Sequence, residues 1–405
     1  MKRPAGACEL WTKACMLATV VESVTTLVTF ASLFYFVAAL WSARSFVQHF
    51  ALDADFAPGV TILKPLKGFD PGMYEAFASH CRQQYAGDYE ILFGVSSLDD
   101  PAVPAVERLQ AEFPERTIRL ILCPERLGPN GKISNVVQMI PHAHYDYFLL
   151  NDSDIHVSPR YLGRVMSRFA ALEKTRSGIN RRVGMVTAPY RGIAHGTLGS
   201  KMEALGISTD FFPGVLTALK LDGEIRFGLG STLAVSRESL AAAGGFEALV
   251  DSLADDYQLG VRIANAGFAV TLSREVVLTS VPAYSLAGFF AHQLRWARAV
   301  RDSRKLGYLG LIFTFGLPLA ILNCIASGFG LPSLALLSLA VAARITVALA
   351  IGVGILGDRQ VLRDLWLLPI RDFCALGVWI WSFAGNSVTW RGEVFVLKDG
   401  KLTAL

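Results

Sequence analysis

Apolar residues are concentrated toward the two ends of the chain, whereas the middle has the mixed composition of a soluble domain. Near the amino terminus, an apolar run extends from about residue 16 to residue 41 and is interrupted by Glu22 and a few threonines. A run of this length can cross a bilayer, which takes about 20 residues. A cleaved signal peptide is the alternative, but no small-residue cleavage site clearly follows the run. We therefore predict a transmembrane anchor within residues 1–50.

Three further apolar stretches lie toward the carboxyl end, at about residues 309–330, 331–356 and 365–385. The first two can span a bilayer. The third carries Arg371 and Asp372 in its middle, and such charges are costly at the centre of a bilayer unless they are paired. The sequence leaves open whether this stretch spans or is re-entrant. We predict a membrane region with a tail over residues 309–405.

The region between the apolar ends, residues 51–283, predicts an α/β domain. Runs rich in branched or aromatic residues predict strands at 60–66, 90–96, 118–124 and 147–154. Helix-like stretches lie between them, at 73–84 and 102–113. Strands and helices that alternate in this way form a parallel sheet with helices on both faces. Ligands bind such sheets at the carboxyl ends of the strands, where the polar motifs of this chain fall.

Residues 284–308 predict a helix that lies in the membrane interface. Aromatic and leucine side chains alternate there with basic ones: Leu286, Phe289, Phe290, Leu294 and Trp296 are set among Arg295, Arg298, Arg301, Arg304 and Lys305.

Composition narrows the class of protein. The chain has 405 residues, of which 52% are hydrophobic, so one soluble domain and several membrane segments fit within it. A net charge of +4 is too small to indicate a nucleic-acid partner. The six cysteines show no CxxC or zinc spacing, so we expect reduced thiols.

Two carboxylates end the last predicted strand of the first half. Asp152 and Asp154 form a DxD motif there, and such a motif can hold Mg²⁺ or Mn²⁺ while leaving positions for a diphosphate. A solvated acidic turn is the competing interpretation.

Two further acidic pairs carry candidate chemistry. Asp100 follows the strand at 90–96 and can accept hydrogen bonds from a nucleobase or ribose, or it can cap the next helix. Asp256 follows Asp255 at the start of an amphipathic stretch, where a cap explains one carboxylate but not both. A carboxylate that faces a bound donor substrate could take the proton from the hydroxyl of an acceptor substrate.

Basic side chains complete the candidate site. Lys132 lies in a Gly/Asn-rich loop at 127–135, which lacks the spacing of a P-loop, and could contact a diphosphate or belong to an ordinary turn. Arg295 could neutralise a leaving diphosphate and Trp296 could stack on a sugar or line an acceptor groove. An interfacial belt of Arg and Trp is the plainer alternative for this pair.

Five motifs in order resemble the ceramide glucosyltransferase family, a lipid-specific branch of the inverting GT-A glycosyltransferases. They are LKPLKG at 63–68, LDDPA at 98–102, DSDI at 152–155, ADDYQLG at 254–260 and the RW pair ending at Trp296. The resemblance covers about residues 60–305, with a weaker match at 388–397.

This resemblance implies a GT-A-like fold, a UDP-hexose donor, a divalent metal and a membrane lipid acceptor. Asp100 matches the family's aspartate for the nucleotide, and Asp152 the one for diphosphate and metal. Asp256 matches the catalytic base, while Arg295 and Trp296 match the RW pair. Asp154 is an additional carboxylate.

Two positions depart from the family pattern. His292 stands where Gln or Arg usually begins the last motif, and Thr209 stands where animal ceramide enzymes carry His. The second departure puts ceramide itself in doubt, since bacterial relatives glycosylate hopanoid lipids such as bacteriohopanetetrol. A processive polysaccharide synthase and a non-catalytic membrane protein are the rival hypotheses.

Two charge signals disagree on orientation. Lys2, Arg3 and Lys13 precede the first segment and only Arg44 closely follows it, which locally favours an outward-facing domain. The basic cluster within 284–308 is larger and favours the cytoplasm, where UDP-sugars are found. We predict an integral protein of the bacterial inner membrane or an equivalent membrane, with a cytoplasmic catalytic domain.

Overall fold

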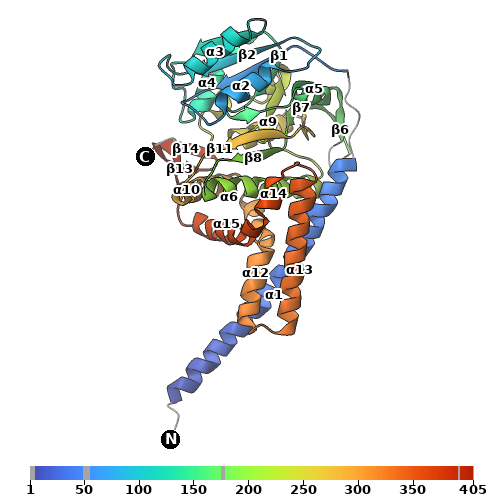
Figure 1. Cartoon of the computed structure of the whole chain (residues 1–405), viewed down its shortest axis with the longest axis vertical. Coiled ribbons are helices and arrows are strands. Elements are labelled where there is room, and N and C mark those ends of the chain that lie inside the picture. Colours follow the sequence, from blue (N-terminus) through green and yellow to red (C-terminus); the bar gives the residue numbers. More distant parts are fainter. Residues whose placement is uncertain (1–4, 49–54, 175–177, 391–392, 405) are drawn as a thin grey trace.

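The computed structural model describes residues 5–48, 55–174, 178–390 and 393–404. Figure 1 shows an α/β domain at one end, helices that lie across its base, and a bundle of long helices that extends away from that base. The long amino-terminal helix belongs to this bundle, and the carboxyl end of the chain returns to the α/β domain.

A mixed sheet forms the centre of the α/β domain. Its strands follow the order β10-β7-β9-β4-β1-β2-β3, and β6 pairs with β7 beside this path. The strands are β1 (Val60–Pro65), β2 (Tyr89–Val95), β3 (Thr117–Leu122), β4 (Tyr147–Leu150), β6 (Leu172–Lys174), β7 (Asn180–Thr187), β9 (Leu233–Ser236) and β10 (Ala269–Leu272). The four predicted strands are confirmed as β1 to β4, and they are parallel as expected.

The second half of the sheet departs from the predicted parallel pattern. Strand β9 runs antiparallel to both β4 and β7, so the sheet is mixed. Its helices are α2 (Met73–Cys81), α3 (Val103–Glu112), α4 (Gly131–Met139), α5 (Tyr161–Met166), α8 (Arg237–Ala242) and α9 (Asp255–Asn265). Every residue of β1 is buried, which explains why the strand is mostly apolar, with Thr61 and Lys64 as its polar residues.

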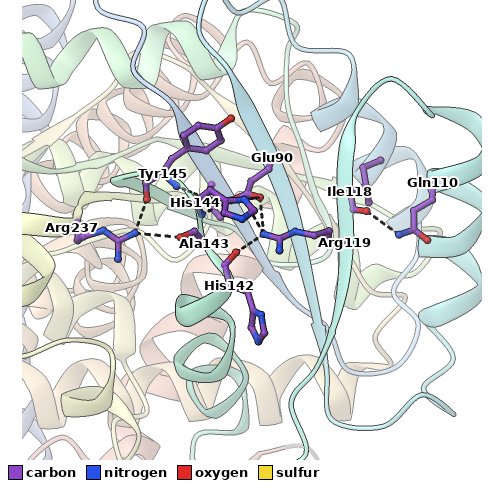
Figure 2. A network of polar contacts seen from close by, with 10 residues as sticks. Glu90, Gln110, Ile118, Arg119, His142, Ala143, His144, Tyr145 and Arg237 are labelled. Carbon is purple, nitrogen blue, oxygen red and sulfur yellow. Dashed lines mark hydrogen bonds and ion pairs between the residues drawn. The ribbon is translucent and has the colours of Figure 1, made fainter.

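A buried carboxylate ties the parallel strands together at their amino-terminal ends, the edge opposite the polar motifs. Glu90 on β2 accepts hydrogen bonds from Thr61 Oγ1 on β1 (2.8 Å), from Arg119 on β3 (2.8 Å) and from the backbone N–H of His144 (2.8 Å). Figure 2 shows Arg119 and His144 converging on this carboxylate. Burial alone would raise the pKa of Glu90, but these hydrogen bonds outweigh burial and lower it.

Two smaller sheets flank the site described below. Strands β5 (Ile155–His156), β11 (Val277–Val281) and β8 (Tyr190–Ala194) form one of them. The carboxyl-terminal segment forms the other, an antiparallel sheet of β12 (Ser387–Trp390), β13 (Glu393–Lys398) and β14 (Lys401–Ala404). The sequence predicts only a tail in this second region.

The membrane region follows the predicted apolar stretches. Helix α1 (Ala5–Gln48) lies beside α12 (Gly316–Ala326) and α13 (Leu331–Val347) in Figure 1. By length and composition, 16–48, 331–353 and 365–382 could each cross a membrane. Helices at 305–314 and 316–326 could form a fourth span, bent by 56°.

The third carboxyl-terminal stretch takes a direction of its own. Helix α15 (Leu368–Ser382) lies crosswise to the long axis of α1, α12 and α13 in Figure 1, close to the base of the α/β domain. It packs against α10 (Leu286–Ser303), the helix expected in the membrane interface.

The basic side chains of helix α10 bind other segments of the protein. Arg298 donates to the backbone carbonyls of Ala384 (2.8 Å) and Ser387, and Arg301 donates to that of Ser382. Arg304 pairs with Asp222 at the end of α7 (Phe212–Asp222). The basic cluster therefore fastens the carboxyl-terminal segment and α7 to α10.

The cysteines with described side chains are reduced, as expected. The four cysteines with described side chains, Cys81, Cys123, Cys324 and Cys374, are free thiols.

Candidate active site

A cavity of about 960 Å³ opens at the carboxyl ends of the parallel strands. The sheet and the loops after its strands form one side, and α6 (Leu198–Gly206) and α10 form another. The carboxyl-terminal sheet contributes Val388, Glu393 and Phe395 to the lining. Glu393 also forms a bidentate pair with Arg126 of the loop after β3 (3.1 and 2.5 Å), which holds this sheet against the domain.

Most of the predicted site residues meet in this cavity. Those that line it are Lys132, Asp152, Asp154, Asp256, Arg295 and Trp296. They come from four separate parts of the chain, as expected if the motifs form a single site.

The DSD turn is held by a lysine from α4. Lys132 Nζ lies 2.7 Å from Asp152 Oδ1 and 3.5 Å from Asp255 Oδ2, so it links the turn to the start of α9. Burial alone would lower the pKa of Lys132, but the two carboxylates outweigh burial and raise it, so the side chain stays charged. The Asp152 side chain remains 44% exposed toward the cavity.

Lys132 does not lie in a loop as the sequence suggests. The helix α4 already begins at Gly131, because the Asn130 side chain accepts a hydrogen bond from the Ile133 backbone N–H (3.0 Å) and caps the first turn.

Asp154 is attached to the neighbouring sheet. Its Oδ2 accepts hydrogen bonds from Thr279 Oγ1 (2.5 Å) and from the backbone N–H of Ser280 (3.0 Å), both on β11. Burial, reinforced by the charge of Asp152, raises the pKa of Asp154 to about 6. Of the two carboxylates in the motif, Asp152 is therefore the one presented more openly to a ligand.

A second lysine, which is not among the predicted site residues, binds the backbone of the DSD turn. Lys64 is fully buried in β1 and donates to the backbone carbonyl of Asp152 (3.1 Å). Burial lowers its pKa to about 7, and the charges of Asp154 and Asp152 oppose that shift. Lys64 lies in the LKPLKG motif, and a lysine inside a predicted strand that is otherwise mostly apolar was the available signal for this role.

The two carboxylates at the start of α9 have different surroundings. Asp255 lies 3.4 Å from the Asn130 amide and 3.5 Å from Lys132, so it belongs to the contacts that join α4 and α9. Asp256 faces Gly230, where a Cβ would lie 3.1 Å from Asp256 Oδ2. Burial, followed by the charge of Asp255, raises the pKa of Asp256 to about 7. Asp256 can therefore exchange a proton near neutral pH.

Asp100 lies outside the cavity lining. Its carboxylate accepts hydrogen bonds from the backbone N–H groups of Gly68 (3.0 and 3.1 Å) and Ala102 (2.9 Å). It therefore holds the loop after β1 against the turn that leads into α3. Its role toward a nucleotide stays a prediction.

The RW pair lies on α10 and faces the same cavity. The Trp296 ring packs 6.3 Å from the Phe211 ring and 5.0 Å from the His292 ring, measured between ring centroids. Phe211 ends a π-helical turn, Ile207–Phe211, that continues α6 and contains Thr209.

The carboxylates fit a metal ion that is shared with a substrate. Within the described ranges, no group of three or more His, Cys, Asp or Glu side chains could hold a metal. Mg²⁺ in nucleotide enzymes needs only one or two carboxylates, because phosphates and waters fill its other positions. Asp152, with Asp154 beside it, supplies oxygen donors of that kind.

Parts of the chain are similar to known proteins. The profile of glycosyl transferase family 21 matches residues 24–403. Ceramide glucosyltransferase 3 of Caenorhabditis elegans is 28% identical over 261 residues, which are 64% of this chain and 54% of that protein. The ceramide glucosyltransferase of Candida albicans is 27% identical over 174 residues, 40% of this chain and 31% of its own length. The chain thus aligns with about half or less of these relatives.

One solved structure shares the fold. The mannosyltransferase PcManGT from Pyrobaculum calidifontis, in complex with GDP-Man and Mn²⁺, has a TM-score of 0.51 and 18% sequence identity to this chain. The similarity covers 89% of this chain and 99% of that one. The predicted glycosyltransferase fold is therefore confirmed.

Proposed function

Because this chain belongs to glycosyl transferase family 21, we propose that it transfers a hexose, glucose or N-acetylglucosamine, from a UDP-sugar to a hydroxyl of a membrane lipid. The acceptor is a ceramide-like or hopanoid lipid. One observation carries this proposal: Asp256, a half-buried carboxylate whose pKa is raised to about 7, lines the same cavity as Asp152, Lys132 and the RW pair.

Each charged residue in the cavity has one role in the reaction. Asp256 takes the proton of the acceptor hydroxyl as the oxygen attacks the anomeric carbon from the face opposite UDP. The bond between that carbon and the diphosphate oxygen breaks, UDP leaves with the electron pair, and the anomeric configuration is inverted. Lys132 and Arg295 place positive charge near the leaving diphosphate.

Two further groups belong to the donor end. A divalent ion, Mg²⁺ or Mn²⁺, held by Asp152 with Asp154 would supply additional positive charge to the diphosphate. We assign Asp100 to nucleotide binding, where it holds the loop after β1 through Gly68.

The direct test is to follow the sugar. The full chain in lipid nanodiscs is given UDP-glucose or UDP-N-acetylglucosamine with a labelled sugar, together with ceramide or bacteriohopanetetrol. We expect label to appear in the organic extract with one donor and one acceptor. Label that accumulates as an aqueous polymer would identify a polysaccharide synthase instead. If the protein neither transfers sugar nor binds either UDP-sugar, it is not an enzyme of this class.

Orientation completes the proposal, with the catalytic domain in the cytoplasm. Single cysteines introduced near residue 110 and near residue 400 of a cysteine-free variant report it through an impermeant thiol reagent on intact cells. We expect neither site to be labelled. Labelling near residue 110 would reverse the orientation, and labelling near residue 400 alone would make 365–382 a true span.

A further inference from the structure

A buried carboxylate that no motif includes lies on the α6 side of the cavity. Glu203 is 3% exposed and is part of the cavity lining. Its Oε2 accepts a hydrogen bond from Gln293 Nε2 (2.7 Å) on α10. Its Oε1 lies 3.2 Å from His292 Nδ1, but this nitrogen is buried and makes no hydrogen bond among the described residues. The carboxylate and the imidazole therefore keep hydrogen-bonding capacity that the protein does not use.

Five aromatic rings run along the same side of the cavity. Consecutive ring centroids are 5.4, 6.3, 5.0 and 5.2 Å apart in the series Tyr190, Phe211, Trp296, His292 and Tyr284. All five residues line the cavity. We call them the aromatic row.

The hydroxyl at one end of the aromatic row is also unused. The Tyr190 side chain is buried, yet its hydroxyl makes no hydrogen bond within the part of the chain that the structure describes. Burial, followed by the charges of Asp256 and Glu203, raises the pKa of Tyr190. Its hydroxyl is therefore a neutral donor placed within the influence of both carboxylates.

This side of the cavity is also the one nearest the membrane helices. Helix α6 continues through the π-helical turn into α7, and α7 packs against α1. Figure 1 shows α6 and α10 between the central sheet and the bundle. Glu203 and the aromatic row therefore lie on the side of the cavity that faces the bundle.

We propose that Glu203 and the aromatic row form a subsite for the polar head of the acceptor, which binds hydroxyl or amide groups adjacent to the reacting hydroxyl. A carboxylate accepts hydrogen bonds from such groups, and aromatic faces pack against their carbon skeleton. The acceptor class is then a lipid with at least one hydrogen-bond donor besides the hydroxyl that receives the sugar. Glu203 is a specificity residue here, and this inference rests on the proposed glycosyltransferase function.

The test removes the hydrogen bond between Glu203 and the acceptor, first by changing the protein and then by changing the acceptor. Glu203→Gln keeps the size of the side chain and removes its charge. The assay compares two kinds of acceptor. Ceramide and bacteriohopanetetrol carry hydrogen-bond donors besides the reacting hydroxyl, whereas dodecanol carries only the reacting hydroxyl. We expect the variant to raise the KM of the first two by about 10-fold or more. The KM for dodecanol and the KM for the UDP-sugar stay unchanged, and Glu203→Asp recovers part of the loss.

A matched variant controls for buried charge. Glu275 is 4% exposed, pairs with Arg164 (2.6 Å) and lies outside the cavity lining, so Glu275→Gln should leave every KM unchanged. Equal losses for dodecanol and the larger acceptors in Glu203→Gln, or an unchanged KM for all of them, would overturn the subsite. Absence of transfer and of UDP-sugar binding in the wild type would instead overturn the proposed function.

Discussion

Two groups of charged side chains in this molecule differ in how fully they are paired. In the membrane region, Arg344 on α13 is 1% exposed and donates to both oxygens of Asp372 (2.8 Å each), to Asp210 (2.8 Å) and to the carbonyl of Thr209 (2.9 Å). In the cavity, Asp256 accepts a hydrogen bond from the backbone N–H of its neighbour Tyr257, and Asp152 is partly exposed. We conclude that complete pairing identifies charges that hold the fold, whereas spare capacity identifies charges that act on a ligand.

The comparison also shows how the third carboxyl-terminal stretch accommodates its two charges. Asp372 pairs with Arg344, while Arg371 lies 3.4 Å from Asp210 and donates to Gln293 (3.4 Å). Asp372 is therefore fully paired. Arg371 is paired through one nitrogen only, because its other two side-chain nitrogens make no hydrogen bond among the described residues. The partners of this group include the π-helical turn beside the cavity. The membrane helices and the cavity wall are joined through this contact.

The largest effect is expected from breaking the complete group. Arg344→Met leaves Asp372 buried without its main partner, so we expect the free energy of unfolding to fall by about 3–5 kcal/mol. Thermal denaturation in detergent measures the loss. The double variant Arg344→Met/Asp372→Leu removes both charges and should recover much of it. A single variant as stable as the wild type would show that this group does not hold the fold.

The next effect concerns the incomplete group and its metal. Activity should vanish with a chelator and return with Mg²⁺ or Mn²⁺. Mutation of a residue that only hydrogen-bonds to a metal ligand typically lowers metal affinity by about 10–100-fold. Asp152→Ala removes a ligand itself, so it should weaken the apparent metal affinity by at least about 100-fold. Asp154→Ala should weaken it less, since Thr279 and Ser280 already bind that carboxylate. Metal titrations of activity separate the two variants, and full activity in excess EDTA would remove both residues from this role.

Glu90 extends the comparison into the α/β domain, where a fully paired carboxylate lies far from the cavity. Glu90→Gln should lower the free energy of unfolding by about 2 kcal/mol, because it weakens hydrogen bonds to a charged group, and should leave turnover unchanged. The pKa of Glu90 is lowered in the folded protein, so its contribution is present above the ordinary pKa of 4.5 and is lost as the pH falls through the folded value. The stability difference should therefore shrink below about pH 4.5. A constant difference at all pH values would contradict this assignment.

The pH dependence of turnover gives a smaller and more specific effect. A general base must be unprotonated, and the pKa of Asp256 is about 7. Below that value, turnover should fall about tenfold for each pH unit, while UDP binding changes little. A rate that is flat between about pH 5 and 8 would exclude Asp256 as the base.

Sequence reasoning recovered the elements that carry a local pattern. Strands β1 to β4 are short, apolar and flanked by amphipathic helices, and the acidic motifs follow them. The antiparallel half and the carboxyl-terminal sheet were missed, and in the second of these β13 shows only a partial apolar pattern because it is exposed at its start. Their pairing depends on contacts between distant parts of the chain.

The same limit applies to the site. Asp152, Asp154, Asp256, Lys132, Arg295 and Trp296 could be found because each lies in a motif or at an expected strand end. Glu203 and Tyr190 carry no motif, and only the packing of α6 against α10 and β8 brings them to the cavity. A glutamate within the largely apolar stretch from 202 to 207 was the one signal available for Glu203.

The most direct measurement compares one carboxylate from each group in the same assay. Asp256→Asn and Asp372→Asn make the same chemical change at a half-buried and at a buried position. We predict that Asp256→Asn lowers turnover by about 100-fold or more and keeps both the melting temperature and UDP binding. Asp372→Asn should lower the melting temperature, with near wild-type turnover for each folded molecule. A stable Asp256→Asn variant that turns over normally, or an Asp372→Asn variant that loses turnover without losing stability, would contradict the division between paired and available charge.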